Sequence, residues 1–342
     1  MQTTLMEQLA LLPDNKTIAD NFSIAWSKIN SALYDKILVS VSGGGGDSDV
    51  LLDIISRCDK DGKAVYAWYD TGLEYMATKD HLGYLEDKYG IKIGTYRPKK
   101  TIPQSCREYG VPFLSKRVSE YIYRLQRHGF DFANGDRPFE ELYKEYPRCK
   151  SALMWWCDKN KAGALCIKDY KYLKEFMMQY PPAFRIASKC CDHAKKNVAH
   201  KILKETECQL NCTGVRKAEG GQRVIAYKSC FNQREDDADL YMPLFWYKDN
   251  DKKQYVDEMG IVHSRCYTEY GLRRTGCAGC PFGKKFEEEL EVIKTYEPKL
   301  YKACLNIFGK SYEYTRQFRE YQKTRKEEDR KKTVLPRVPA IE

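Results

Sequence analysis

The feature that most constrains the fold is a run of glycines placed directly after a short apolar segment. Residues 36–41 have the β-branched, apolar character of a buried parallel strand, and residues 50–55 have helical spacing. A strand that ends in glycines and opens a helix lets backbone N–H groups face an anion, because glycine has no Cβ to block its approach. We therefore expect an anion-binding loop made of Ser42, Gly43, Gly44, Gly45, Gly46, Asp47 and Ser48.

Further elements of alternating type follow this loop. Residues 64–69 and 91–96 have strand character, and residues 74–89 between them have a helical pattern. Strand, loop, helix, strand, helix and strand in this order predict an α/β fold with a doubly wound, mostly parallel, Rossmann-like sheet. The ranges outside it are expected to be an amphipathic lead-in helix at 1–30, a helical aromatic region at 131–185, a region rich in cysteine and glycine at 186–283 and charged helices from about 286.

The division of the chain follows from these shifts in character. We expect a nucleotide-type α/β domain with its lead-in helix in residues 1–185. Residues 186–342 are expected to contain the cysteine-rich motifs and charged C-terminal helices packed on that domain. A chain of 342 residues is long enough for one large domain or two modest ones.

Composition limits the location and partners. No apolar run approaches the roughly 18–20 residues that cross a bilayer, and the first 20 residues lack the basic-then-apolar order of an export signal. We therefore expect a cytoplasmic protein that does not contact a membrane. The formal net charge of +10 is compatible with a polyanionic partner. The 14 cysteines are many for a chain in a reducing compartment, which favours metal, cluster or redox chemistry over a disulfide framework.

The chemistry of the glycine loop can be narrowed further. It lacks the Gly-Lys-Ser/Thr ending of a Walker A loop and the spacing of the dinucleotide fingerprint. The hydroxyls of Ser42 and Ser48 can donate to an anion, and Asp47 can cap the helix or approach Mg²⁺. The alternative is a flexible glycine turn with no ligand.

A second candidate anion site lies in residues 214–223. Arg216 and Arg223 are seven residues apart with Glu219 between them, and an arginine fork suits an oxyanion. A surface helix joined by salt bridges is the alternative. Glycines at 214, 220 and 221 favour a loop that approaches a ligand.

The cysteine pattern suggests a metal centre. Cys190 and Cys191 are adjacent, and Cys277 and Cys280 form a C-x-x-C pair. Four thiolates can hold a [4Fe-4S] cluster or Zn²⁺, and a redox dithiol or buried structural thiols are the other interpretations. Cys230 and Cys266 are possible substitute ligands.

A basic segment with interleaved tyrosines follows the third expected strand. Residues 97–127 contain eight Lys or Arg and two Glu. Basic side chains neutralise phosphates and aromatic rings stack on bases, so a nucleic acid is one possible partner. A solvated helix with its apolar face turned inward is the other.

These motifs together resemble a known family. The loop at 42–48 resembles the S-G-G-x-D-S pyrophosphate loop of the N-type ATP pyrophosphatase superfamily, with one extra residue that places glycine where lysine is frequent. Asp70, Thr71 and Gly72 resemble the D-T-G of its PAPS reductase branch. Further similar segments follow in the order of that branch, at 110–116, 156–157, 214–223, 243–246 and 274–283.

The resemblance implies an activity and a set of partners. It implies binding of an adenine nucleotide, ATP or PAPS/APS, with Mg²⁺, and a setting in sulfur chemistry. Asp47, Ser48, Arg216 and Arg223 would act in catalysis. The loop from Ser42 to Gly46, the Asp70–Gly72 turn and Glu219 would bind nucleotide. The four cysteines Cys190, Cys191, Cys277 and Cys280 would hold a cluster, as in APS reductases and related thiolation enzymes.

Three functions remain open at this point. The first is ATP-dependent activation coupled to sulfur insertion, with a donor such as a cysteine desulfurase or thioredoxin-like protein and an acceptor such as DNA or tRNA. The second is PAPS or APS reduction, which is less favoured because no E-C-G-L-H motif follows residue 283. The third is a nucleotide-binding scaffold without turnover. A homodimer is compatible with each.

Overall fold

A computed structural model describes residues 4–220, 226–235 and 237–334. Contacts group the chain into two compact units, each built from segments that are distant in sequence. The first contains Met1–Ile102, Cys191–Ala278 and Glu291–Leu300, and the second contains Pro103–Cys190, Gly279–Leu290 and Tyr301–Glu342. The division into 1–185 and 186–342 expected from motif order stays a prediction.

A six-stranded sheet forms the centre of the first unit, with strand order β3-β2-β1-β4-β6-β5. All neighbouring pairs are parallel except β5 with β6. Strand order reverses beside β1, the kind of position where open α/β sheets bind ligands. The predicted α/β fold with a mostly parallel Rossmann-like sheet is confirmed. The strands are β1 (Ile37–Val41), β2 (Ala64–Tyr69), β3 (Ile93–Tyr96), β4 (Leu210–Cys212), β5 (Phe231–Asn232) and β6 (Asp239–Tyr241).

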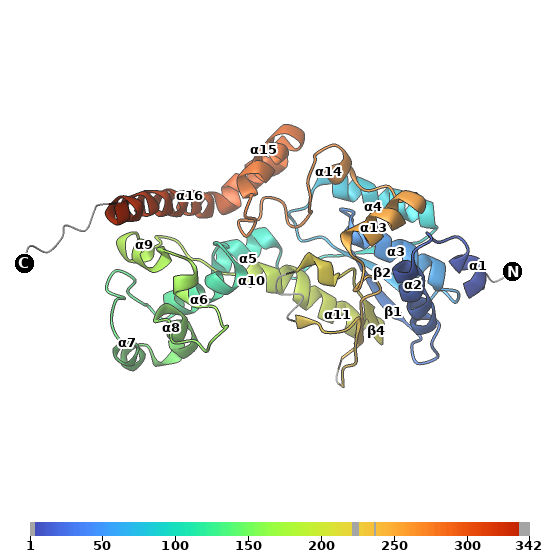
Figure 1. Cartoon of the computed structure of the whole chain (residues 1–342), viewed down its shortest axis with the longest axis horizontal. Coiled ribbons are helices and arrows are strands. Elements are labelled where there is room, and N and C mark those ends of the chain that lie inside the picture. Colours follow the sequence, from blue (N-terminus) through green and yellow to red (C-terminus); the bar gives the residue numbers. More distant parts are fainter. Residues whose placement is uncertain (1–3, 221–225, 236, 335–342) are drawn as a thin grey trace, which may run out of the picture. The chain divides into compact units, whose positions relative to one another are not determined.

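Helices cover both faces of this sheet (Figure 1). Alternate residues of a strand point to opposite faces. Ile37, Val39 and Val41 of β1 therefore join one apolar core with α2, α3, α4 and α13, whereas Leu38 joins another with α11. The helices of this unit include α1 (Leu5–Leu9), α2 (Lys16–Ile29), α3 (Asp47–Cys58), α4 (Met76–Tyr89), α11 (Asn197–Thr206), α13 (Asp249–Glu258) and α14 (Arg265–Thr268).

The lead-in region differs from the single helix expected over residues 1–30. It forms two helices, α1 and α2, separated by a segment that contains Pro13. Proline disfavours helical backbone at the residue before it, and the Asn15 side chain accepts from the Ile18 N–H to begin α2 afresh.

The second unit is helical and has an aromatic core. Trp155, Trp156 and Phe176 are fully buried there beside Phe113 and Phe318. Aromatic side chains bury large areas, which lets short helices share one core. The other described α-helices, of which α5, α10, α15 and α16 include residues of both units, are α5 (Ile102–Tyr109), α6 (Lys116–Arg127), α7 (Phe139–Glu145), α8 (Lys150–Trp156), α9 (Leu173–Gln179), α10 (Lys189–Cys191), α15 (Phe286–Tyr296) and α16 (Pro298–Val334). Within the described ranges, no helix combines the length and apolar character needed to cross a bilayer.

Candidate functional site

The glycine loop joins β1 to α3 with a backbone that glycine adopts readily. Gly43, Gly45 and Gly46 have φ angles of 67°, 106° and 68°, in the region that L side chains disfavour. The Ser42 N–H donates to Ser48 Oγ at 2.8 Å and closes the loop on itself. Ser42 is exposed, whereas the four glycines are buried.

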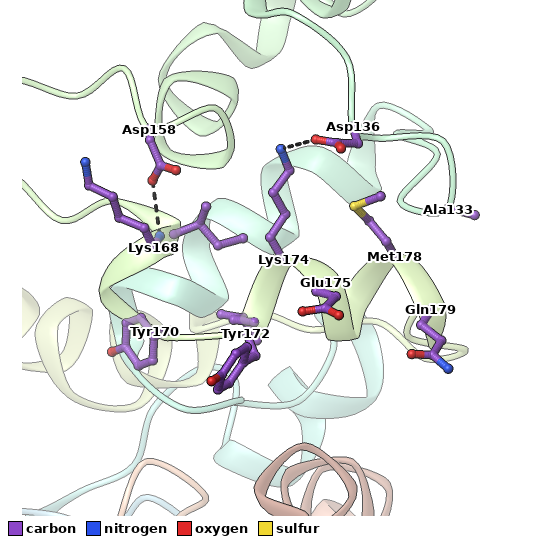
Figure 2. A pocket seen from close by; sticks show the side chains of 12 residues that line it. Ala133, Asp136, Asp158, Lys168, Tyr170, Tyr172, Lys174, Glu175, Met178 and Gln179 are labelled. Atoms are coloured by element: carbon purple, nitrogen blue, oxygen red, sulfur yellow. Dashed lines mark hydrogen bonds and ion pairs between the residues drawn. The ribbon is translucent and has the colours of Figure 1, made fainter. Parts of the chain in front are cut away.

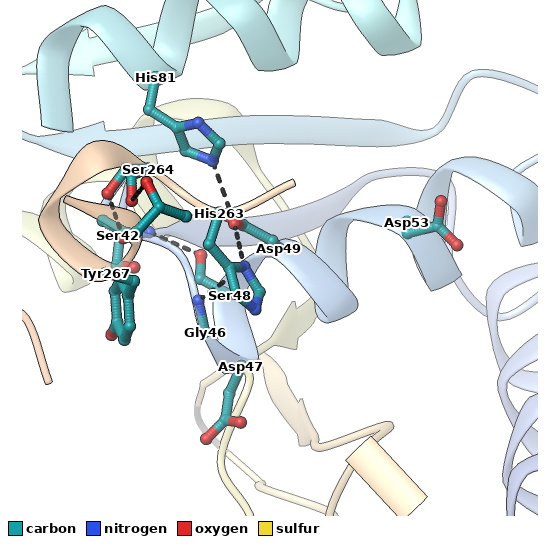
Figure 3. A network of polar contacts seen from close by, with 12 residues as sticks. Ser42, Gly46, Asp47, Ser48, Asp49, Asp53, His81, His263, Ser264 and Tyr267 are labelled. Atoms are coloured by element: carbon teal, nitrogen blue, oxygen red, sulfur yellow. Dashed lines mark hydrogen bonds and ion pairs between the residues drawn. The ribbon is translucent and has the colours of Figure 1, made fainter. Parts of the chain in front are cut away.

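Residues from 263 to 275 cover the loop (Figure 3). Ser264 Oγ donates to the Gly44 carbonyl at 2.6 Å. A Cβ on Gly44 would lie 2.0 Å from Thr275 Oγ1, and one on Gly46 would lie 3.1 Å from the Tyr267 hydroxyl. The glycines therefore allow a close approach, and in this structure the approaching atoms are the protein's own.

Asp47, the first residue of α3, joins the loop to the distant arginine motif. Its Oδ1 accepts from Arg216 Nε at 2.8 Å and contacts Lys252 Nζ at 2.9 Å. Arg216 also pairs with Asp249 at 2.9 Å. Gly214 is needed for this approach, because a Cβ there would lie 2.9 Å from the Asp47 carbonyl oxygen. Two predicted catalytic residues, Asp47 and Arg216, are thus brought together.

Asp49, in the first turn of the same helix, lies between two imidazoles. Its Oδ2 is 3.0 Å from His81 Nε2 and 2.9 Å from His263 Nδ1. Burial acts to raise the pKa of Asp49, but the hydrogen bonds from His263 and His81 outweigh it and lower the pKa. An ionised carboxylate only accepts, so His263 Nδ1 donates to Asp49 and cannot at the same time accept from the Gly46 N–H, 3.3 Å away.

A cavity of about 170 Å³ opens at the carboxyl ends of β1 and β2. It adjoins the first residue of the glycine loop, Ser42, and carries both an acid and a base. The lining residues are Ser40, Val41, Ser42, Trp68, Tyr69, Glu74, Thr78, Lys195, Thr275 and Gly276.

The predicted turn at residues 70–72 shapes one side of this cavity. Asp70 accepts from the Gly72 N–H at 3.1 Å and from Arg97 Nε at 3.1 Å, so its carboxylate fixes the turn. The Thr71 hydroxyl donates to Glu74. Burial raises the pKa of Glu74 to about 7, which allows this carboxyl to gain or lose a proton near neutral pH.

A lysine links the cavity to the cysteine motifs. Lys195 lies in a π-helical stretch, Asp192–Lys196, and its amine donates to the Cys277 sulfur. Burial raises the pKa of the Cys277 thiol. π-helical turns are frequent at functional sites because they re-aim a side chain.

One family model matches a segment of the chain that contributes to this site. Residues 36–137 match the family model of the phosphoadenosine phosphosulfate reductase domain. That segment is similar to this reductase-domain family. It includes β1, the glycine loop, α3 and the Asp70–Gly72 turn. The comparison with curated proteins finds no match.

Solved structures with similar chains have low identity. A phosphoadenylyl-sulfate (PAPS) reductase from Candida auris, in a phosphate complex, is 15% identical with a TM-score of 0.39 over 81% of this chain and 95% of its own. The NH3-dependent NAD synthetase from Campylobacter jejuni, bound to nitrate, is 8% identical with a TM-score of 0.35 over 94% of this chain and 97% of its own. The U34-tRNA thiolase from Methanococcus maripaludis, with its [4Fe-4S] cluster, is 12% identical with a TM-score of 0.38 over 90% of this chain and 80% of its own. None is similar enough to bring its ligand or activity to this chain.

Outside the matched segment, the arginine motif is only partly described. Glu219 is exposed and accepts from the Arg216 N–H at 3.2 Å, which caps its own short turn, Lys217–Glu219. Arg223 lies outside the described residues. The turn is short, as its glycines predict, and its role in nucleotide binding stays a prediction.

The four candidate cysteines are divided between the two units. Cys191 and Cys277 belong to the first unit, and Cys190 and Cys280 belong to the second. In the part of the chain that the structure describes, no group of three or more His, Cys, Asp or Glu side chains is arranged to hold a metal. The cluster or zinc ligand set therefore stays a prediction, and we derive no reaction step from it.

The two substitute ligands have ordinary surroundings. Cys266 is buried, and its sulfur lies 3.8 Å from the Thr78 hydroxyl. The Cys230 carbonyl accepts from the Met242 N–H beside the sheet edge. All 14 cysteines lie among the described residues, and none of them is in a disulfide bond.

A wider, open hollow of about 580 Å³ lies in the second unit, beside α9 (Figure 2). Three of its charged side chains, Lys174, Asp136 and Asp158, already have partners. Lys174 pairs with Asp136 at 2.8 Å, and Asp158 accepts from the Lys168 N–H at 3.1 Å. No chemistry converges there, so we assign the site to the first unit.

Several residues of the site carry no clear signal in the sequence. Lys195 is four residues after Cys191, and this spacing was a usable clue. Lys252 lies in a segment with three lysines, and nothing in its neighbourhood distinguishes it. His81 and His263 are 182 positions apart, and only folding places both on Asp49.

Proposed function

We propose that this chain is an enzyme that binds ATP at the carboxyl ends of β1 and β2. It would release pyrophosphate while activating an acceptor for sulfur transfer. The observation that carries the proposal is the cavity that adjoins a glycine loop at the point where strand order reverses. The match of residues 36–137 to the phosphoadenosine phosphosulfate reductase domain supports an adenylyl nucleotide as the ligand.

The proposed reaction is an adenylation. An acceptor oxygen attacks the α-phosphorus of ATP, the bond from this phosphorus to the bridging oxygen breaks, and pyrophosphate leaves with the bonding electrons. A sulfur nucleophile then displaces AMP from the activated acceptor. Loop N–H groups and the start of α3 stabilise the negative charge on the leaving group. Bound Mg²⁺ would supply further positive charge, and Asp47 is the carboxylate placed to hold it.

Phosphate binding requires a rearrangement of the loop's cover. The hydroxyls of Tyr267 and Thr275 occupy the space beside Gly46 and Gly44. The cavity reaches Ser42, so a nucleotide that fills it presents its phosphates to the edge of this cover. We therefore propose that Tyr267 and Thr275 move aside as the phosphates enter.

Sulfonucleotide reduction is the second candidate, and the family match favours it. That reaction needs a cysteine that can attack the sulfonucleotide. Cys304 is the last cysteine in the sequence, and it is fully buried within α16. A Cβ on Gly279 would approach its sulfur to 2.9 Å. Because this packing shields Cys304, it favours ATP over PAPS or APS as substrate. For the ATP reaction, a thioredoxin-like protein or a cysteine desulfurase would be the sulfur donor.

The surface of α6 supports a nucleic acid as acceptor. Val118, Ile122 and Leu125 face the core, whereas exposed cations point outward. Exposed Lys and Arg neutralise phosphates and release the counterions bound to them. The cations of this surface, here called the α6 basic face, are Arg117, Arg124 and Arg127.

A pyrophosphate assay under anaerobic conditions tests the proposal. The protein is incubated with ATP and Mg²⁺, alone and with DNA or tRNA, and in parallel with PAPS and thioredoxin. We expect pyrophosphate from ATP, at least a tenfold stimulation by the acceptor, and loss of release in Asp47→Ala. PAPS turnover with no ATP turnover would establish the reductase instead. Binding of ATP without either turnover would establish a scaffold.

A separate measurement tests the metal prediction. Iron, zinc and the visible spectrum are measured on protein purified without oxygen. We expect one cluster or one zinc per chain, lost in Cys277→Ser. Protein free of both metals would overturn the cysteine assignment and leave the ATP proposal standing.

A further inference from the structure

The glycine loop lacks a cation of its own, although it is expected to face a polyphosphate. Residues 42–48 contain no Lys or Arg, and their one charged residue is Asp47. Backbone N–H groups supply only partial charges, so a highly charged leaving group calls for a full positive charge nearby. The structure supplies one from elsewhere in the chain.

Lys252 brings an ammonium group to the start of α3. Its Nζ lies 2.9 Å from Asp47 Oδ1 and would lie 3.6 Å from a Cβ placed on Gly46. Its side chain is 23% exposed, so the amine is sheltered and still open to a ligand. The next lysine, Lys253, is 74% exposed and pairs with Asp257 on its own helix.

The packing of α13 on α3 fixes this placement. Tyr255 is fully buried, and its hydroxyl donates to Asp53 of α3 at 2.8 Å. Tyr255 follows Lys252 by about one helical turn, and Asp53 follows Asp47 by about two. The hydrogen bond between Tyr255 and Asp53 therefore holds Lys252 beside the first turn of α3.

Arg216 and Lys252 have different freedom to meet a ligand. The Arg216 guanidinium is held by Asp47, by Asp249 and by the Tyr247 carbonyl, and its side chain is only 7% exposed. Lys252 pairs with Asp47. A flexible ammonium can leave one oxygen for another at low cost, whereas a guanidinium held in three directions cannot.

We propose that Lys252 is a binding residue for the β- and γ-phosphates of the nucleotide, and supplies the positive charge that the four-glycine loop lacks. This inference rests on the proposed function. Asp47 holds Lys252 at the loop while the site is empty. When nucleotide enters, the ammonium transfers its contact from Asp47 Oδ1 to phosphate oxygens, and Asp47 keeps its hydrogen bond from Arg216 while its carboxylate becomes more accessible to Mg²⁺.

The test compares ligands with and without β- and γ-phosphates. Calorimetry with Mg²⁺ measures the affinities of ATP, AMP and inorganic pyrophosphate for the full chain and for Lys252→Ala, Lys252→Arg and Lys253→Ala. We expect Lys252→Ala to lower the affinity for ATP and for pyrophosphate at least tenfold, and the affinity for AMP less than twofold. Lys252→Arg should recover most of the affinity, and Lys253→Ala should match the unaltered protein.

The outcomes separate this inference from the proposal on which it rests. If Lys252→Ala binds ATP more tightly than AMP by the same factor as the unaltered protein, the inference is overturned and the proposed function stands. An equal loss for ATP and AMP means that Lys252 only supports the fold, which also overturns it. If the unaltered protein binds neither ATP nor pyrophosphate, the proposed function fails and this inference fails with it. Lys252→Gln replaces the alanine variant should that one unfold.

Discussion

The two units use positive charge in different ways. Beside the glycine loop of the first unit, two cations are sheltered and paired with particular acids. The side chains of Arg216 and Lys252 are 7% and 23% exposed, and both contact Asp47. On α6 of the second unit, Arg124 is 47% exposed, and Arg117 and Arg127 extend from the same helix into solvent.

This difference separates a site from a surface. A sheltered cation is weakly screened by salt and acts on a ligand of fixed geometry. An exposed cation is strongly screened and acts on a polyanion of any sequence. We therefore expect small phosphates to bind in the first unit, and long polyanions to bind on the second with a steep dependence on salt.

The largest expected effect comes from the core of the second unit. Trp156 is fully buried, donates to the Gly135 carbonyl at 2.8 Å and packs on Phe130 and Phe132. Trp156→Ala should lower the free energy of unfolding by about 3–5 kcal/mol, measured by denaturant titration. The exposed Trp246 provides the control, and Trp246→Ala should change the free energy of unfolding by about 1 kcal/mol or less.

Ligand binding in that variant tests whether the units act separately. Below its unfolding transition, Trp156→Ala should bind ATP normally and a polynucleotide more weakly. A parallel loss of both affinities would refute the contrast between the units.

The second prediction concerns the close backbone approach beneath the loop. Gly214→Ala places a methyl group 2.9 Å from the Asp47 carbonyl oxygen and must displace the start of α3. A misplacement of about 1 Å at a catalytic group can cost roughly 100-fold in rate, so pyrophosphate release should fall by up to about that factor. Gly83→Ala, in open space on α4, is the control and should leave the rate unchanged.

The third prediction follows from the raised pKa of Glu74, about 7 against an ordinary 4.5. A carboxyl whose pKa is raised by folding destabilises the fold progressively as pH rises from about 4.5 to about 7. Glu74→Gln removes this cost. The variant should therefore gain about 1–2 kcal/mol relative to the unaltered protein between pH 5 and pH 8, measured by thermal unfolding.

A carboxyl with the opposite shift serves as the control. The pKa of Glu86 is lowered, mainly by the hydrogen bond from the Ile93 N–H. Glu86→Gln should therefore lose stability relative to the unaltered protein as pH rises toward about 4.5, and this difference should stay level between pH 5 and pH 8. Equal pH profiles for both variants would show that Glu74 is not held in its protonated form.

The smallest expected effect concerns the α6 basic face. Replacing Arg117, Arg124 and Arg127 together by alanine should weaken polynucleotide binding roughly fivefold at 0.15 M salt. The slope of log affinity against log salt should fall by about 2–3, because fewer counterions are released. ATP affinity should stay unchanged. The same number of alanines at Lys323, Lys326 and Arg330 of α16 should have less effect, and an equal effect would remove any special role for α6.

Much of the central fold could be predicted from local pattern. The apolar run at 36–41 gave a strand within one residue of β1, and the segment 64–69 matches β2. Short buried strands followed by glycine and a helix have few other folded solutions. The lead-in helix was predicted too long, because its apolar spacing continues across Pro13.

The composition of the site shows where local pattern stops. Ser42, Asp47 and Ser48 are neighbours in sequence, and their spacing alone identified the loop. Lys252 reaches that loop because α13 packs on α3, and Thr275 covers it because a distant segment folds back. Neither contact leaves a periodic signal.

The sequence by itself determined the first three strands of the sheet, the glycine loop and the loop residues that can meet a phosphate, because these depend on backbone conformation and short-range spacing. Only the tertiary structure decided which charges surround the loop. Asp47 meets Arg216 and Lys252 across 169 and 205 positions of chain, and Asp49 meets His81 and His263. Such contacts depend on how separate elements pack on one another, and that packing is set by the whole core.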